Sequence, residues 1–324
     1  MRTKFLVGAL AVAVLLPGQL ASAQGTSVPR VGVILQGGPW YAIVDGLREG
    51  LRELGLLEGK HFVLDIRDTR GDLKAVEEAA RNLEQQKVNL IYAAATSVSL
   101  AVKQATQSIP IVFVAGTNPV RVKLVESIPA PGGRLTGVHF RATDLMGKRL
   151  ELLREIVPNL RRVVTFYNPT NQSAVEAAKE GREAARNLGL DFIERQVASV
   201  EELQKALHAY RTGDADAFIS VSDAMVDSQI QSVIDMGKAK SLPTMLYEPG
   251  SVLQGGLATY SADFKEIGRL SAKYVQRILA GANPALLPVE SIDRLMFVIN
   301  LKTAKQIGLK IPEPVLIRAD KIIE

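Results

Sequence analysis

The chain has 324 residues, enough for two domains that each bury a core. Its formal charge of +5 is small, and no run of Lys or Arg forms the kind of surface that binds nucleic acid. The absence of Cys excludes disulfides and thiolate sites. We therefore expect two domains and no nucleic-acid partner.

The N-terminus has the three parts of a secretory signal peptide. Arg2 and Lys4 precede an apolar run at 5–16, and Ala21-Ser22-Ala23 has the small-residue form of a signal-peptidase site. The apolar run is shorter than the roughly 20 residues that cross a bilayer. We predict that 1–23 is a signal peptide cleaved after Ala23, and that the mature chain lies in the periplasm and is not embedded in a membrane.

The first half of the mature chain alternates apolar, β-branched runs with amphipathic helical patterns. The expected strands are 30–35, 62–67, 89–94 and 111–114. The expected helices are 43–54, 72–83 with Asp72 as its cap, 98–105 and, opened by Pro119, 119–125. Parallel strands need crossover helices, so this alternation predicts a doubly wound parallel sheet.

The alternation starts again after Phe140, although we detect no sequence repeat. The expected strands of the second half are 162–167, 191–197, 217–221 and 243–247. Its expected helices are 144–156 with Asp144 as the cap, 174–188, 199–210 with a capping box, and 224–233. This second block predicts a second Rossmann-like lobe of the same form.

The C-terminal segment is too short for a third domain. It contains a strand-like passage at 255–259, a capped helix at 263–280, an extended segment at 284–290 and a strand at 296–300. We expect it to complete the first lobe and then cross back. The predicted lobes are therefore 28–139 plus 262–294, and 140–261 plus 295–324.

Polar residues in the turns after the strands are the candidate binding groups. In parallel α/β sheets these turns lie at the carboxyl ends of the strands, where helix N-termini bind anions. We expect Thr96, Ser97 and Thr117 to bind a ligand carboxylate through backbone N–H groups and hydroxyls, with Asn118 beside them. The alternative is that these side chains only cap their helices.

Other candidates follow the strands of both lobes. Asp223 follows 217–221 and is placed to receive an ammonium group, or else to cap a helix. His139 lies at the predicted first crossing between the lobes, where it lines the cleft or has a structural role. Four aromatic residues either contact apolar ligand surface or simply pack; they are Trp40, Tyr41, Tyr167 and Tyr247.

No pattern for catalysis is present. The three histidines, His61, His139 and His208, are scattered without an i, i+4 pair or a partnering carboxylate motif, which argues against a metal site or a catalytic triad. The sequence has no Gly-x-x-x-x-Gly-Lys-Ser/Thr loop for nucleotide phosphates. We expect a binding protein rather than an enzyme, with no catalytic residue, metal or cofactor.

Short motifs in order along nearly the whole mature chain resemble the ABC-transporter substrate-binding family whose characterised members bind tryptophan and tyrosine. The motifs are Leu54-Gly55 with Glu58-Gly59-Lys60, Ile109-Pro-Ile-Val-Phe113, Asn118-Pro-Val120, Pro131-Gly-Gly133 with Leu135-Thr-Gly137, Gly147-Lys-Arg-Leu150, Gly281 with Pro284 and Leu287-Pro-Val289, Ile299-Asn-Leu-Lys-Thr-Ala304 and Arg318-Ala-Asp320.

The resemblance implies a type I periplasmic-binding-protein fold, with two lobes joined by three hinge crossings and a small ligand between them. It also implies two partners, a membrane permease and a cytoplasmic ATPase, and we expect the chain itself to be a monomer. Relatives commonly carry Gly-Asp-Pro where this chain has Thr117-Asn118-Pro119. Because the amide removes a counter-charge, an amino acid and a carboxylate with an uncharged body both stay open as ligands. The alternative function is an exported sensor module for a membrane receptor, which a histidine kinase or chemoreceptor encoded beside it would favour.

Overall fold

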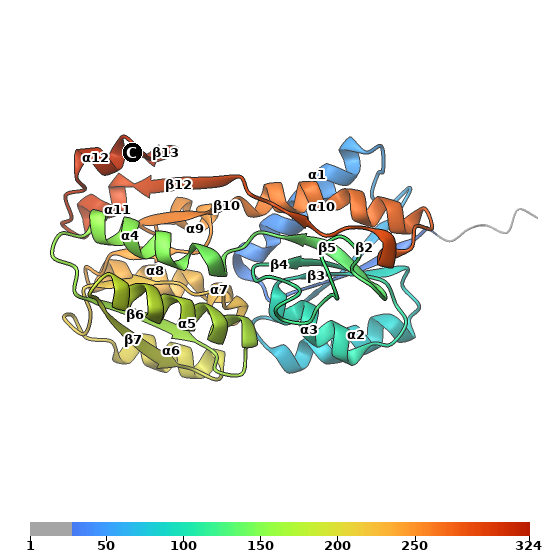
Figure 1. Cartoon of the computed structure of the whole chain (residues 1–324), viewed down its shortest axis with the longest axis horizontal. Coiled ribbons are helices and arrows are strands. Elements are labelled where there is room, and N and C mark those ends of the chain that lie inside the picture. Colours follow the sequence, from blue (N-terminus) through green and yellow to red (C-terminus); the bar gives the residue numbers. More distant parts are fainter. Residues whose placement is uncertain (1–27) are drawn as a thin grey trace, which may run out of the picture.

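The computed structural model describes residues 28–324, so the predicted signal peptide lies outside the described residues. Two lobes lie side by side, and helices cover both faces of the β-sheet in each lobe (Figure 1). The predicted α/β fold with two doubly wound lobes is confirmed. Within residues 28–324, no helix combines the length and the hydrophobicity needed to cross a bilayer.

The first lobe contains a six-stranded sheet in which every pair of neighbours is parallel, in the order β11-β5-β4-β3-β1-β2. Its strands are β1 (Arg30–Leu35), β2 (Val63–Asp68), β3 (Leu90–Ala94), β4 (Ile111–Ala115), β5 (Leu135–His139) and β11 (Glu290–Ser291). Its helices are η1 (Gly38–Trp40), α1 (Tyr41–Glu53), α2 (Leu73–Gln85), α3 (Thr96–Ala105), α10 (Phe264–Leu279) and η3 (Pro284–Leu286).

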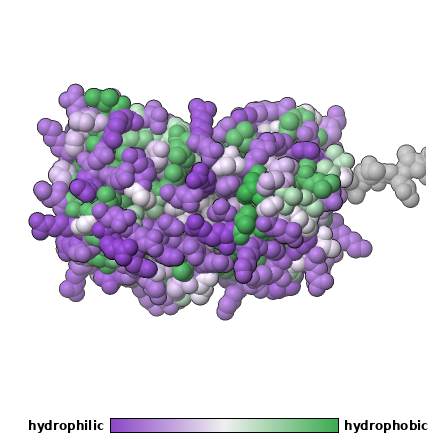
Figure 2. All heavy atoms as spheres, viewed as in Figure 1, coloured by the Kyte–Doolittle hydropathy of each residue, from purple (hydrophilic) through white to green (hydrophobic). Residues whose placement is uncertain are grey.

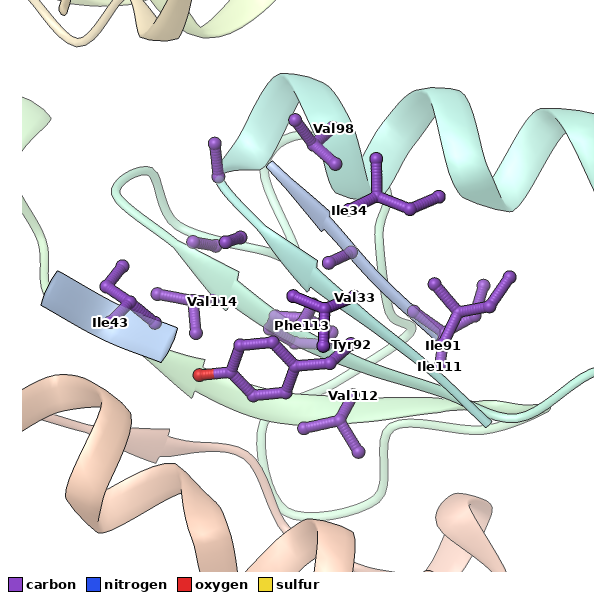
Figure 3. Close-up of a cluster of buried hydrophobic side chains, with 14 of the residues drawn as sticks. Val33, Ile34, Ile43, Ile91, Tyr92, Val98, Ile111, Val112, Phe113 and Val114 are labelled. Carbon is purple, nitrogen blue, oxygen red and sulfur yellow. The ribbon is translucent and has the colours of Figure 1, made fainter. Parts of the chain in front are cut away.

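The core of this lobe forms because its central strands are apolar on both faces, as expected for a covered parallel sheet. Figure 3 shows side chains of β1, β3 and β4 together with Ile43 of α1 and Val98 of α3. Tyr92 of β3 points toward α10, where its hydroxyl lies 2.6 Å from the Ser271 hydroxyl. The helix α10 therefore belongs to the first lobe, although it follows most of the second lobe in sequence.

The second lobe contains a seven-stranded sheet in the order β13-β12-β10-β9-β8-β6-β7, parallel except between β10 and β12. Its strands are β6 (Arg162–Tyr167), β7 (Asp191–Gln196), β8 (Ala217–Ile219), β9 (Thr244–Leu246), β10 (Ala258–Ala262), β12 (Leu295–Asn300) and β13 (Lys321–Ile323). Its helices are η2 (Thr143–Leu145), α4 (Met146–Ile156), α5 (Gln172–Asn187), α6 (Val200–Ala209), α7 (Ala224–Ser228), α8 (Ile230–Ala239), α9 (Pro249–Leu253), α11 (Leu301–Gln306) and α12 (Glu313–Leu316).

The chain passes between the two sheets three times: from β5 to α4, from β10 to α10, and from β11 to β12. These are the three crossings that the family resemblance implies. On the face shown in Figure 2 both lobes are mainly hydrophilic, and the exposed apolar side chains are scattered. The carboxyl ends of the parallel strands of both sheets point into the region between the lobes (Figure 1), which places the turns after β1, β3, β4, β6, β8 and β9 there.

Four local predictions were wrong. The segment expected to be extended at 284–290 begins with the 3-10 helix η3, and the single helix expected at 224–233 is two helices, α7 and α8. Residues 119–125 form turns rather than a helix, since Lys123 adopts a left-handed conformation with φ 57° that a continuing helix excludes. Asp144 does not cap α4, because its carboxylate accepts a hydrogen bond from Arg141 Nε at 2.9 Å and a short 3-10 turn leads into the helix instead.

Candidate functional site

Hydroxyl groups from the two lobes form a continuous chain of contacts where the strand ends meet. The Thr117 hydroxyl, after β4, lies 2.5 Å from the Ser173 hydroxyl at the start of α5 and 3.1 Å from that of Thr143. Ser173 continues to Ser222 at 3.3 Å, and Ser222 to the hydroxyl of Tyr247 at 2.9 Å. All five side chains are buried, so the lobes are closed on each other here.

Aromatic rings reinforce this closed contact. Tyr247 of the second lobe belongs to the core cluster of the first, with its ring centroid 6.4 Å from that of Trp40 and 6.0 Å from that of Phe140. The Tyr247 hydroxyl lies against Gly116, and any side chain larger than hydrogen at that position would collide with it. Gly116 is thus required by close approach of the other lobe.

The predicted carboxylate-binding residues of the first lobe come together. Thr96 is buried, and its hydroxyl accepts hydrogen bonds from the backbone N–H groups of Gly116 at 3.0 Å and Thr117 at 3.3 Å. Thr96 and Ser97 open α3, which has no side-chain cap. The residue before it, Ala95, has φ 132°, a strained conformation for a non-glycine residue that is often found at functional sites.

Three other predicted residues of the first lobe lie around this centre. Asn118 Oδ1 accepts hydrogen bonds from the N–H groups of the next turn, and the Tyr41 hydroxyl donates to Asp68 at 3.0 Å. Tyr41 is exposed. His139 is buried at the end of β5 and its Nδ1 has no partner; burial, followed by the charge of Arg141, lowers its pKa. The neutral imidazole is therefore favoured.

In the second lobe, two predicted residues are engaged within their own lobe. The Tyr167 hydroxyl donates to Glu194 at 2.8 Å, on the neighbouring strand β7. Asp223 caps α7, since its Oδ1 accepts from the N–H groups of Met225 and Val226 and its Oδ2 accepts from that of Asn168. Of the two roles considered for Asp223, the contacts show the helix cap. Ligand binding by the ten named residues stays a prediction.

Three polar residues that the sequence reasoning missed are buried between or beside the lobes with unpartnered atoms. Gln36, after β1, leaves both amide atoms without a partner, and Asp227 of α7 leaves Oδ2 without one. Arg149 of α4 is fully buried; it donates to the carbonyls of Met245 and Leu246, while its Nε is unpartnered. Buried polar atoms are normally satisfied, so this cluster needs an explanation.

Three ionisable side chains of the second lobe, Asp227, Glu248 and Arg149, are buried and have shifted pKa values. Burial, then the charge of Asp223, raises the pKa of Asp227 well above its usual range, and Arg149 opposes that rise. Burial also raises the pKa of Glu248 to about 7, although the N–H groups of Gly250 and Ser251 bond to it. Burial lowers the pKa of Arg149 to about 10, so its guanidinium stays protonated at neutral pH.

A sequence signal for two of these residues exists. Arg149 lies three residues after Met146 on α4, and Asp227 lies three residues after Ala224 on α7, so each shares a helix face with a buried apolar residue. A charged side chain at a stripe position is buried by the helix geometry, and a buried charge needs a partner. Gln36 carries a weaker signal, as one polar residue directly after a buried strand.

A family model described as ABC transporter substrate binding protein matches residues 30–323. Among curated proteins, a tyrosine-binding protein of Clostridioides difficile (strain R20291) is 25% identical over 266 residues, which is 82% of this chain and 76% of that protein.

Solved structures match over almost the whole described chain. A conserved domain protein from Vibrio cholerae O1 biovar El Tor aligns with a TM-score of 0.84 and 29% identity, covering 91% of this chain and 100% of the other. An ABC domain in complex with L-Trp from Streptococcus pneumonia aligns with a TM-score of 0.80 and 26% identity, covering 92% and 100%. The two-lobed arrangement is thus shared along its full length.

Proposed function

The chain belongs to the ABC transporter substrate-binding protein family, and from this membership we propose that it is the solute-binding component of an ABC importer. It holds a small carboxylate-bearing ligand, an amino acid, aromatic ones included, or a related acid, between its lobes. It then delivers the ligand to a membrane permease driven by a cytoplasmic ATPase. The signal-peptide pattern at 1–23 supports a periplasmic location.

The observation that carries the carboxylate assignment is the start of α3. The first N–H groups of a helix have no partner within the helix, and its dipole favours a negative group there. In the first lobe, α2 and α10 have Asp caps, and α1 continues directly from η1 without a cap. The helix α3 also has no side-chain cap, and it begins in the closed region between the lobes. A carboxylate of the ligand takes the place of the cap, beside the Thr96 and Thr117 hydroxyls.

The closed contact between the lobes supports delivery by hinge closure. The contacts of Thr117 with Ser173 and of Gly116 with Tyr247 join the two lobes. Opening separates these pairs and exposes the site, and closing removes the ligand from water. Hydrogen bonds to a charged ligand then contribute about 1.5–3 kcal/mol each, so three or four reach the roughly 8 kcal/mol of micromolar affinity.

The test is a binding experiment on the protein expressed from the full-length gene. A thermal-shift screen with the twenty L-amino acids and with indole-3-propionate selects binders, because a ligand of the folded form raises its melting temperature. Calorimetric titration then compares the wild type with a Thr96→Ala, Thr117→Ala double variant. We expect the double variant to bind at least about tenfold more weakly, since it loses two hydroxyls beside the carboxylate.

Thr212→Ala is the matched control, because Thr212 is exposed on the loop before β8, in the second lobe. It should bind like the wild type. Wild-type affinity in the double variant would contradict the carboxylate placement, and the absence of binding to every compound would contradict the proposed class of ligand.

A further inference from the structure

Three turns of the first lobe each present a glycine to the second lobe. Gly38 follows β1, Gly71 follows β2 and Gly116 follows β4. A side chain at any of these positions would begin less than 3.0 Å from an atom of the second lobe. The lobes therefore touch at three separate points in the closed form, and each point requires a residue without a side chain.

Two of these contacts involve the same helix of the second lobe, α7. A Cβ atom on Gly38 would lie 2.8 Å from the Asp227 carbonyl oxygen, and one on Gly71 would lie 2.9 Å from the Ser228 hydroxyl. The Cβ atom on Gly71 would also lie 2.9 Å from a methyl group of Val200, at the start of α6. The turn after β2 thus packs against both α6 and α7.

The turn after β2 is fixed by contacts within the first lobe. Thr69 is buried, and both its N–H group and its hydroxyl donate to the Leu35 carbonyl at the end of β1. Arg70 has φ 50° and Gly71 has φ 87°, and the Arg70 N–H donates to Asp68 Oδ1 at 2.9 Å. A left-handed conformation is unfavourable for a residue such as Arg, so the surrounding contacts impose it. The first lobe itself therefore sets the shape of this turn.

This turn lies on the side of the molecule away from two of the crossings between the lobes. In Figure 1, α2, which directly follows the turn, and α6 lie at the edge opposite α10 and β12, which those two crossings reach. Residues 70–74 of the first lobe and 198–201 of the second line a groove of about 550 Å³ there. None of the residues 95–97 at the start of α3 lines this groove, so it is separate from the proposed carboxylate position.

We propose that the turn at 69–72 is a clasp, which holds the lobes closed on this side of the interface without contacting the ligand. Elsewhere in the interface, the hydroxyls of Thr117 and Ser173 and the ring of Tyr247 join the lobes. Because all these contacts join protein to protein, the closed form is populated before a ligand binds, and the ligand shifts an existing equilibrium. This inference rests on the hinge closure of the proposed function and specifies which groups set it.

The experiment measures the open and closed forms through the distance between two spin labels on the full-length gene product. The chain has no Cys, so Glu78→Cys on α2 and Lys205→Cys on α6 label one exposed position in each lobe. Dialysis removes bound solutes, and native mass spectrometry verifies their removal. Pulsed electron paramagnetic resonance then gives the ratio of short distances, from the closed form, to long distances, from the open form.

We expect the labelled protein to show short distances with no ligand added. In Gly71→Leu the new side chain meets α6 and α7, so the ratio of short to long distances should fall at least about tenfold, as for an overpacked contact. Gly59→Leu is the matched control, because Gly59 lies in the same lobe with φ 83° and nothing lies within 4 Å of its Cβ position. It reproduces the backbone strain without the collision, and its ratio should equal that of the labelled protein.

Only long distances in the labelled protein without ligand would overturn the inference, and this result requires no variant. A Gly71→Leu ratio equal to that of Gly59→Leu would overturn the clasp as well. Either result leaves the proposed ligand binding standing, because the thermal-shift screen and the titration test that binding separately. No binding in that screen, together with the expected distances, would contradict the proposed class of ligand and support the clasp.

Discussion

The two lobes share one architecture and differ in what they present at their strand ends. The first lobe offers neutral groups and an uncapped helix: Gln36, Thr96 and Thr117 at the start of α3 and nearby. The second lobe presents charged groups, with Asp227 and Arg149 fully buried. The same fold thus presents neutral hydrogen-bonding groups from one lobe and buried ionisable groups from the other, where the two lobes meet.

The lobes also differ in how they are held together internally. In the first lobe, α1 and α10 come from opposite ends of the chain and meet backbone to backbone. Gly268 faces the Ile43 carbonyl and Gly46 faces the Lys265 carbonyl, so closely that a methyl group at either glycine collides with the other helix. The helices of the second lobe contain a glycine without such a contact, Gly147 of α4, whose nearest neighbour is 3.8 Å away.

The largest effect that we predict is a loss of stability when the close contact between α1 and α10 is disrupted. Gly268→Ala forces α1 and α10 apart and should lower the free energy of unfolding by about 3 kcal/mol, as for an overpacked core. Gly147→Ala, in the second lobe, should be neutral or raise the free energy of unfolding by roughly 0.5–1 kcal/mol, because alanine favours the helix and its methyl group meets Ala184 only at an ordinary contact distance. Urea unfolding of both variants measures the contrast. Equal stability of the two would show that α10 does not hold the first lobe as its contacts indicate.

The second prediction concerns one carboxylate in each lobe that accepts hydrogen bonds from backbone N–H groups, Glu248 in the second lobe and Glu84 in the first. The pKa of Glu248 is about 7 instead of 4.5, so the folded protein binds this proton more tightly than the unfolded chain. The associated cost is absent below pH 4.5 and complete above pH 7, where it reaches about 3 kcal/mol. Glu248→Gln should remove this fall in stability between pH 4.5 and 7, measured by urea unfolding across that range.

Glu84 in the first lobe provides the matched control with the opposite sign. Burial raises its pKa, but the N–H groups of Ser108, Ile109 and Gln107 lower it on balance. The stability that Glu84 contributes is therefore present above its unfolded pKa and is lost as the pH falls. Glu84→Gln should lower stability above about pH 4.5, and its difference from the wild type should disappear as the pH falls below that value. A Glu248→Gln variant with the pH profile of the wild type would contradict the burial of that carboxylate.

The sequence was sufficient for the alternation of elements and the paired lobes, because hydrophobic period and capping residues act locally. Asp72, Ser199 and Asp263 cap their helices as predicted. The site was only partly predictable, because its contacts join residues that are far apart in the sequence. Asp223 was predicted either to bind an ammonium group or to cap a helix, and it is a cap, whereas Asp227, four residues later on the same predicted helix, was not singled out and is buried.

The smallest predicted effect lies at the rim of the closed contact. Arg121, after β4, pairs with Glu180 of α5 across the lobes at 3.2 Å, but both side chains are substantially exposed. Such pairs contribute roughly 0.2–1 kcal/mol, so Glu180→Gln should weaken ligand binding less than about fivefold. The loss should appear at about 20 mM salt and vanish near about 0.5 M, because salt screens exposed charges.

Glu151→Gln is the control for this prediction, since the Lys148–Glu151 pair lies within α4 and does not cross between lobes. It should leave ligand affinity unchanged at both salt concentrations. A loss in Glu180→Gln that exceeds about tenfold and persists at high salt would mean that closure depends on this exposed pair. That outcome would mean that the exposed pair stabilises the closed state more than the buried polar groups of the two lobes do. It would contradict our proposal that the buried groups hold the ligand.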